Sequence, residues 1–192
     1  MKTLVMDTSN NYLAIAFYKD DKLIDQCKIE ALKKQSELAI PMMQKMLGSV
    51  SLKDIDEMII AIGPGSYTGV RIALTIAKTL ATVCPVKVKA ISSLKMLAGY
   101  DKAMAIIDAR GKKYYVGIYN QGQVVLEDQL ATEERLTELK QEYSDYLIKM
   151  YDESIDLTKN LYALAKQEDY VENVDALVPC YIKEVEAKKQ CL

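Results

Sequence analysis

The chain has 192 residues, 50% of them apolar, with a formal charge of −2 and no histidine. That length and apolar content are enough for one large globular domain or two small ones. The lack of imidazole excludes Ser-His and Cys-His nucleophile pairs, histidine general bases and H-E-x-x-H metal sites, and the slightly acidic charge argues against independent binding of nucleic acid.

The sequence contains no apolar run long enough to span a membrane, and its N-terminal stretch MKTLVMDTSNN carries no secretion signal. We therefore expect a cytoplasmic protein that does not enter a membrane. The cysteines are scattered without a C-x-x-C pair, which favours reduced thiols over disulfides or a zinc site. They are Cys27, Cys84, Cys180 and Cys191.

The first half of the chain predicts the element order βββαβαβ. The first thirty residues predict three strands separated by the turn stretches DTSNN and KDDK, and apolar residues then recur at helical spacing up to Gly48. The predicted strands are Thr3–Met6, Tyr12–Tyr18, Lys22–Ile29, 58–62 and Val86–Ile91, and the predicted helices are Gln35–Leu47 and 70–83.

A glycine-rich turn, GPGSYTG, joins the predicted strand 58–62 to the helix that follows. Backbone N–H groups at such a helix start can cradle a phosphate. The turn is neither a Walker loop, which needs Gly-Lys-Ser/Thr, nor the dinucleotide fingerprint, because Gly63, Gly65 and Gly69 have the spacing G-x-G-x-x-x-G. The alternative is that the glycines only shape a tight reversal and that Ser66 or Thr68 caps the helix.

The second half echoes the first. VMDTSNNYLAIAFYKDDKLIDQ aligns with IIDARGKKYYVGIYNQGQVVLEDQ, which places Asp7 over Asp108 and Tyr18 over Tyr119. Chance similarity between two hairpins is the alternative interpretation. Beyond Leu130 we expect a helix over Glu133–Tyr143, a strand over 146–150 and a helix over 157–166.

Two tandem βββαβα units, each with an aspartate at the end of its first strand, are typical of the ribonuclease H-like fold of the actin-like ATPase superfamily. Proteins of that α/β fold bind nucleotide between their two lobes. We expect a first lobe over residues 1–100 and a second, trimmed lobe over residues 101–192.

The sequence resembles the TsaB family, also called YeaZ-like, in segments that follow one another along nearly the whole chain. The most specific of them is GPGSYTGVRIALTIAKTLA, in which Tyr67 stands where phenylalanine is usual. The others are MDTSNNYLAIA, QSELAIPMMQKML, AISSLKMLA, IIDARGKKYYVGIY and VPCYIK.

The resemblance implies a non-catalytic subunit of the bacterial machinery that adds threonylcarbamoyl to the adenosine beside the tRNA anticodon. Its partners would be a catalytic TsaD-type subunit and a TsaE-type ATPase, with tRNA reached through the complex and a homodimer formed when the subunit is alone. No intrinsic cofactor is implied, since ATP, ADP and metal would belong to the partner subunits.

The resemblance also implies that the chain has no catalytic residue and no metal ligand. In the catalytic relative two histidines four residues apart on a helix bind the metal, and in SSLKML these places are taken by Ser93 and Leu97. Neither side chain can replace a histidine ligand, so we do not expect endopeptidase activity, a label that such chains have carried. The region after Leu130 is short for the family.

The turn and the two strand ends form the candidate site for weak binding of a nucleotide or another anion. In a working kinase of this fold Asp7 and Asp108 would hold magnesium, and otherwise they only cap turns. The candidate residues are Asp7, Thr8, Gly63, Gly65, Ser66, Thr68, Gly69, Arg71, Asp108 and Arg110.

Two predicted helices supply a candidate partner interface. Small residues recur every fourth position on one helix, and flexible methionines gather on the other. The alternative is that both stripes are core that faces the sheet. The interface candidates are Leu38, Met42, Met43, Met46, Gly69, Ala73, Ala77 and Ala81.

Two other functions stay open at this point. The first is a small ATP-dependent phosphotransferase that uses Asp7 or Asp108 with magnesium. The second is a homodimeric interaction module that is unrelated to tRNA.

Overall fold

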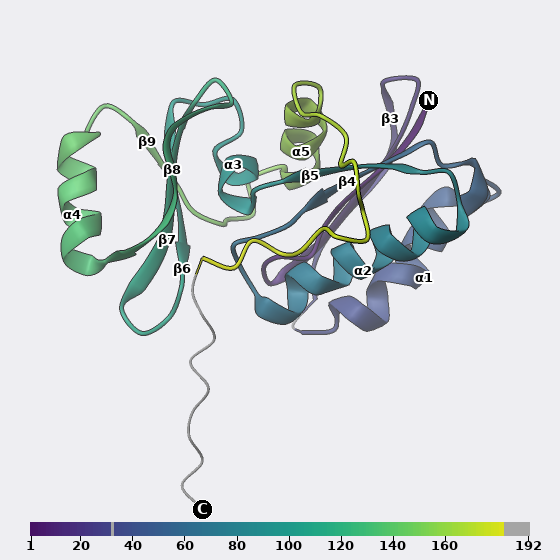
Figure 1. Cartoon of the computed structure of the whole chain (residues 1–192), viewed down its shortest axis with the longest axis horizontal. Coiled ribbons are helices and arrows are strands. Elements are labelled where there is room, and N and C mark those ends of the chain that lie inside the picture. Colours follow the sequence, from purple (N-terminus) through teal and green to yellow (C-terminus); the bar gives the residue numbers. More distant parts are fainter. Residues whose placement is uncertain (32, 183–192) are drawn as a thin grey trace, which may run out of the picture.

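The computed structural model describes residues 1–31 and 33–182 and contains two separate β-sheets (Figure 1). The first sheet has five strands in the order β3-β2-β1-β4-β5, and the second has four in the order β8-β7-β6-β9. The first consists of β1 (Lys2–Asp7), β2 (Tyr12–Lys19), β3 (Lys22–Glu30), β4 (Glu57–Ala61) and β5 (Lys87–Ile91). The second consists of β6 (Ala103–Asp108), β7 (Lys113–Asn120), β8 (Gln123–Thr132) and β9 (Leu147–Lys149).

The helices form two groups along the chain. Those that precede β6 are α1 (Gln35–Leu47), the 3-10 turn η1 (Leu52–Asp54), α2 (Tyr67–Val83) and α3 (Ser93–Ala98), and those that follow β8 are α4 (Glu133–Glu142) and α5 (Leu157–Ala165). Within the described part of the chain, no helix has both the length and the apolar content to cross a membrane.

Both sheets repeat one pairing pattern. In the first sheet β1 pairs antiparallel with β2 and parallel with β4, and in the second β6 pairs antiparallel with β7 and parallel with β9. The predicted internal repeat and the predicted βββαβα order of each unit are therefore confirmed. The second sheet has no counterpart of β5 among the described residues, in agreement with a trimmed second unit.

The two sheets enclose a shared apolar layer. Helices α3 and α5 lie between them, while α1 and α2 cover the outer face of the first sheet and α4 covers the outer face of the second (Figure 1). The Tyr18 ring on β2 stacks on the Tyr162 ring of α5 with centroids 3.7 Å apart. The two halves of the chain thus both contribute side chains to the apolar layer between the sheets.

Most predicted elements are observed within one or two residues of their expected ends. The clearest difference is α2, which begins at Tyr67 rather than Val70 because the Ser66 side chain accepts the Gly69 N–H and caps the helix three residues earlier. Cys27, Cys84 and Cys180 are free thiols, and Cys191 lies outside the described residues.

Candidate functional site

The GPGSYTG turn packs directly against the turn that follows β1. The Ser66 N–H donates to the Ser9 carbonyl over 2.7 Å, and the Thr8 hydroxyl donates to the Gly69 carbonyl over 2.7 Å. The same hydroxyl accepts the Ala73 N–H over 3.2 Å. The Thr8 hydroxyl thereby bonds to both the Gly69 carbonyl and the Ala73 N–H, which are four residues apart and form the usual donor and acceptor pair of an α-helix.

Two of the three glycines are required by this close approach. A Cβ at Gly65 would lie 2.3 Å from the Ser9 carbonyl oxygen, and a Cβ at Gly69 would lie 2.0 Å from the Thr8 carbonyl oxygen. Gly63 has φ +97°, a backbone conformation that favours glycine. The chain's own backbone therefore occupies the space that the glycines create.

Three of the turn's amides, which could otherwise bind a phosphate, are already engaged within the chain. The Ser66 N–H bonds to the Ser9 carbonyl, and the Gly69 N–H donates to the Ser66 hydroxyl over 3.2 Å. The Gly63 N–H donates to the Ser93 hydroxyl over 3.1 Å. Thr68 is exposed and does not cap the helix, since Ser66 does. This arrangement favours the second interpretation of the turn, in which its glycines shape the strand-to-helix reversal.

Asp7, at the end of β1, is completely buried. Its Oδ1 accepts the Ser9 N–H over 2.9 Å and its Oδ2 accepts the Asn10 side-chain N–H over 2.6 Å. Burial raises the pKa of this carboxyl, against the opposite effect of these bonds. Magnesium prefers accessible oxygen ligands and keeps several of its waters. The Asp7 environment does not fit such an ion.

Tyr151 lies over this region. Its hydroxyl is 3.2 Å from the Ser9 hydroxyl, and burial together with the nearby Asp7 carboxylate raises the pKa of its phenol. Sequence reasoning missed Tyr151, because it lies 142 positions from Ser9 along the chain and belongs to no motif.

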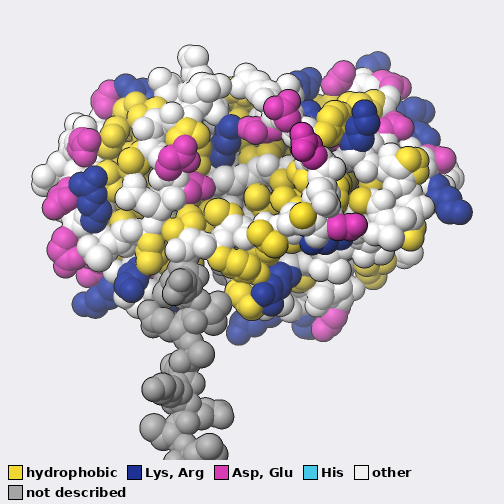
Figure 2. Space-filling model, viewed as in Figure 1, with side chains coloured by type: hydrophobic (Ala, Val, Ile, Leu, Met, Phe, Trp, Pro, Cys, Tyr) yellow, Lys and Arg dark blue, Asp and Glu magenta, His cyan; other side chains and the backbone are white. Residues whose placement is uncertain are grey.

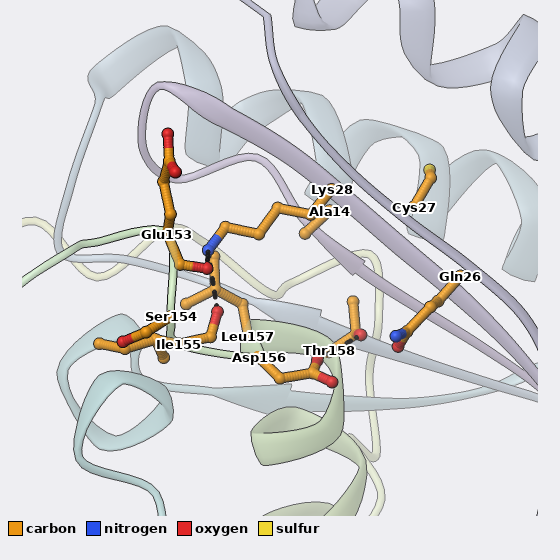
Figure 3. Close-up of a pocket in the computed structure, with 10 residues that line it drawn as sticks. All are labelled: Ala14, Gln26, Cys27, Lys28, Glu153, Ser154, Ile155, Asp156, Leu157 and Thr158. Carbon is orange, nitrogen blue, oxygen red and sulfur yellow. Dashed lines mark hydrogen bonds between the residues drawn. The ribbon is translucent and has the colours of Figure 1, made fainter.

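A single lysine holds the segment that carries Tyr151. The Lys28 ammonium donates to the carbonyls of Asp152, Glu153 and Ile155 at 2.8, 3.2 and 2.9 Å. Figure 3 shows Lys28 reaching from its strand toward the Glu153 and Ile155 carbonyls, at a cavity of about 270 Å³. Lys28 thus ties β3 of the first sheet to the connection between β9 and α5.

The second aspartate differs sharply from the first. Asp108 is exposed at the end of β6, and its Oδ1 accepts the Arg110 N–H over 2.7 Å. Arg110 is also exposed and has φ +61°. Asp7 and Asp108 are equivalent in the repeat but lie in opposite environments, and each accepts a backbone N–H two residues further on.

Arg71 lies outside the turn, between two tyrosines. Its guanidinium carbon is 3.8 Å from the centre of the Tyr67 ring and 5.6 Å from that of Tyr181, and its Nε–H donates to the Tyr181 hydroxyl over 2.7 Å. That hydrogen bond is the main cause that raises the pKa of Arg71.

Figure 2 shows hydrophobic side chains gathered on the viewed face around α2 and the C-terminal segment beside it.

Five of the eight predicted partner-interface residues face this chain's own core. Met43, Met46, Gly69, Ala73 and Ala77 are buried within this chain's own fold. The small-residue stripe lets α2 lie close to its own sheet. The other three candidates, Leu38, Met42 and Ala81, are half-buried.

The face of α1 and α2 that points away from the sheet is formed largely by other residues than the predicted interface residues. Ile40 of α1 is 40% exposed, Thr75 of α2 is exposed, and Ile72 and Ile76 of α2 are half-buried. Helices α1 and α2 contact each other and lie side by side on the first sheet (Figure 1). Sequence reasoning missed these residues because α2 is apolar around much of its circumference, and periodicity alone does not tell its inner face from its outer one.

Comparisons with known proteins agree with this fold. A family model described as tRNA N6-adenosine threonylcarbamoyltransferase, TsaD, matches residues 29–172. The tRNA threonylcarbamoyladenosine biosynthesis protein TsaB of Bacillus subtilis is 37% identical over 66% of this chain, and that of Escherichia coli is 30% identical over 62%. The chain spans only 58% and 55% of the length of these two relatives.

A solved structure extends the comparison to the whole fold. YeaZ from Pseudomonas aeruginosa superimposes with a TM-score of 0.75 and 22% identity, covering 94% of this chain and 100% of that one. The expected fold class, two tandem ribonuclease H-like units of the actin-like type with the second one smaller, is confirmed.

Proposed function

Since the chain belongs to the family described by the TsaD model, and within that family to the TsaB or YeaZ-like group, we propose a function on that basis. The chain is a non-catalytic subunit in the biosynthesis of threonylcarbamoyladenosine in tRNA. It holds a TsaD-type catalytic subunit, which a TsaE-type ATPase joins. ATP, ADP and metal belong to these partners, and tRNA is reached through the complex.

The burial and internal hydrogen bonding of the Asp7 carboxyl group are the observation that carries this proposal. Its carboxyl is completely buried and both of its oxygens accept hydrogen bonds from the chain itself. A group in that state cannot present an oxygen to a hydrated metal or to a phosphate without local unfolding. What the chain can offer is therefore its surface.

The outward face of α1 and α2 is the proposed docking surface for the catalytic subunit. It combines partly accessible apolar side chains, Leu38, Ile40, Met42, Ile72 and Ile76, with short polar ones such as Thr75. A helix pair from a partner can pack across two adjacent helices and bury roughly 800 Å² on each side, the size of a standard interface.

Sedimentation velocity of the chain mixed with a TsaD-type subunit tests this surface. Ile40→Asp and Thr75→Asp each place a charge on the outward face, and we expect each to weaken the complex at least tenfold. Val125→Asp is the matched control, since Val125 is 42% exposed on β8 and lies away from both helices. The proposal fails if the wild-type chain forms no complex at about 10 μM, or if all three variants bind as the wild type does.

A small phosphotransferase is the second candidate function. The equivalent placement of Asp7 and Asp108 at the ends of β1 and β6 favours it. The burial of Asp7 opposes it.

A further inference from the structure

The turn between β6 and β7 carries three cationic side chains within four residues, Arg110, Lys112 and Lys113. Arg110 and Lys112 are exposed, and Lys113, at the start of β7, is half-buried. A Cβ at Gly111 would have no atom within 4 Å, so the turn projects into open space. Figure 2 shows Lys and Arg side chains at the lower left rim of the molecule, where Figure 1 places this turn.

The equivalent turn of the first sheet has a different character. The β1–β2 turn reads TSNN and carries no charge, and its Thr8 and Ser9 are buried. The internal repeat aligns Ser9 with Arg110 and Asn11 with Lys112. The same structural position thus holds neutral side chains in one sheet and exposed cations in the other, so the repeated architecture does not require the cations.

The positive charges of the β6–β7 turn are available to a partner. In the part of the chain that the structure describes, no carboxylate oxygen lies within 4.0 Å of a side-chain nitrogen of Arg110 or Lys113. The Lys112 ammonium lies 4.0 Å from a Glu133 oxygen, and its side chain is 83% exposed. Such an exposed ion pair contributes little. The Asp108 carboxylate, at the start of the turn, accepts the Arg110 backbone N–H over 2.7 Å.

The backbone of the turn gives no reason for arginine and lysine at these positions. Arg110, Gly111 and Lys112 have φ values of +61°, +65° and +57°. Glycine and asparagine adopt this left-handed conformation at lower cost than long side chains do. Residues held in such conformations concentrate at functional sites. Stability alone therefore does not favour two cations here, and an interaction with a partner does.

Phosphate is the chemistry that these side chains fit. A guanidinium binds phosphate oxygens through two parallel hydrogen bonds, and an ammonium binds them as a point charge. The proposed function brings one phosphate-rich molecule to the complex, which is tRNA. The chain has a formal charge of −2, and a few cations neutralise only a few phosphates. The turn can therefore add to the binding of tRNA but cannot hold tRNA by itself.

We propose that the β6–β7 turn contacts the phosphate backbone of the tRNA that the assembled complex holds. Arg110 and Lys112 bind neighbouring phosphates, and these contacts position the tRNA without reading its sequence. The turn belongs to the second sheet, whereas α1 and α2 cover the first, so both surfaces can be occupied at once (Figure 1). The inference rests on the proposed function and adds the part of this chain that meets the substrate.

Fluorescence anisotropy of a labelled, unmodified tRNA tests this contact, with the complex of this chain and a TsaD-type subunit formed beforehand. A double variant, Arg110→Asn with Lys112→Asn, removes both charges, and asparagine tolerates the positive φ. Each lost phosphate contact lowers the slope of log affinity against log salt by roughly 0.7 to 0.9. We expect the slope to fall by about 1 to 2, and the affinity at about 100 mM salt to fall about tenfold.

The matched control removes the same charge from the exposed ends of β2 and β3, by Lys19→Asn with Lys22→Asn. Arg110→Lys keeps the charge of the turn and should keep the salt slope. Circular dichroism reports whether each variant is folded. The single variants Arg110→Asn and Lys112→Asn should each give about half of the change in slope, which keeps the test valid if the double variant is not folded.

Sedimentation velocity separates the contact with tRNA from the assembly of the complex. An intact complex whose salt slope falls in the turn variants, with the control unchanged, supports the inference. An intact complex with wild-type affinity and slope for tRNA overturns it, and so does an equal fall in the control. A turn variant that no longer forms the complex would show that the turn meets a protein, which also overturns it. A wild-type chain that forms no complex at about 10 μM overturns the proposed function itself, and this inference with it.

Discussion

Thr8 and Gly69 are joined by a hydrogen bond and by backbone contact. The Thr8 hydroxyl donates to the Gly69 carbonyl over 2.7 Å, and a Cβ at Gly69 would lie 2.0 Å from the Thr8 carbonyl oxygen. The end of β1 and the beginning of α2 are consequently one packed unit, and the glycine-rich turn is filled by the protein itself.

Replacing Gly69 tests this packing. We expect Gly69→Ala to lower the free energy of unfolding by about 3 kcal/mol, since the new methyl group meets a backbone oxygen and not a flexible side chain. Chemical denaturation measures the loss. Gly111→Ala is the control, because no atom lies within 4 Å of a Cβ there and only the positive φ of +65° costs about 1 kcal/mol. Equal losses in the two variants would contradict the account.

Asp7 should make stability depend on pH. Burial raises the pKa of its carboxyl above the ordinary 3.8, so the folded state holds this proton more tightly than the unfolded state does. Its contribution to stability is therefore full below pH 3.8 and is lost as the pH rises through the raised pKa. In Asp7→Asn this component disappears, and urea denaturation from about pH 2 to pH 8 should show a flatter profile above pH 4 than the wild type.

Asp20 offers a control for that experiment, because its contribution to stability changes with pH in the opposite direction. The N-terminal ammonium of Met1 holds the pKa of Asp20 below 3.8, so the contribution of Asp20 is present above that pH and is lost as the pH falls. Asp20→Asn should remove a dependence at the acidic end only. A difference between wild type and Asp7→Asn that stays constant with pH would show that Asp7 titrates alike in both states.

Lys28 should control the connection that carries Tyr151. Its ammonium donates to three backbone carbonyls, and Lys28→Met keeps most of the stem but leaves those carbonyls without their donor. We expect a loss of about 2 kcal/mol in the free energy of unfolding and faster hydrogen exchange over residues 152–155. Lys22→Met, on an exposed position of the same strand, should change neither quantity. Unchanged exchange in Lys28→Met would show that the segment is held in another way.

A charge on the inner stripe of α2 should unfold the chain and so cannot probe docking. Ala77 is completely buried, so Ala77→Glu forces a carboxylate into the apolar layer between α2 and the first sheet, at a cost of about 4 kcal/mol or more. Thr75→Glu, at an exposed position of the same helix, should stay within about 0.5 kcal/mol of the wild type. Thermal denaturation separates the two. A folded and fully stable Ala77→Glu would contradict the observed orientation of α2.

The sequence was sufficient for the elements of the fold because their signals are local. The helix over Gln35–Leu47 was predicted with its observed ends, since its apolar spacing and Gly48 fix both. The repeat that aligns Asp7 with Asp108 was also readable, because it preserves residue order and turn positions. These features need no knowledge of distant contacts.

The site was less predictable because its contacts are distant along the chain. Tyr151 meets Ser9, and Lys28 meets the 152–155 carbonyls, across more than 120 positions. The burial of Ala73 and Ala77 depends on which side of α2 faces the sheet, and small residues on a helix favour close packing against either a sheet or a partner. Only the assembled fold distinguishes the two.

The central claim is that the chain contributes a surface and not a reaction. Isothermal titration of the isolated chain with ATP and magnesium, followed by measurement of released phosphate, tests it most directly. We expect neither a micromolar binding isotherm nor turnover, because Asp7 is buried and the amides of Gly63, Ser66 and Gly69 are bonded within the chain. Micromolar binding accompanied by sustained phosphate release would contradict the account.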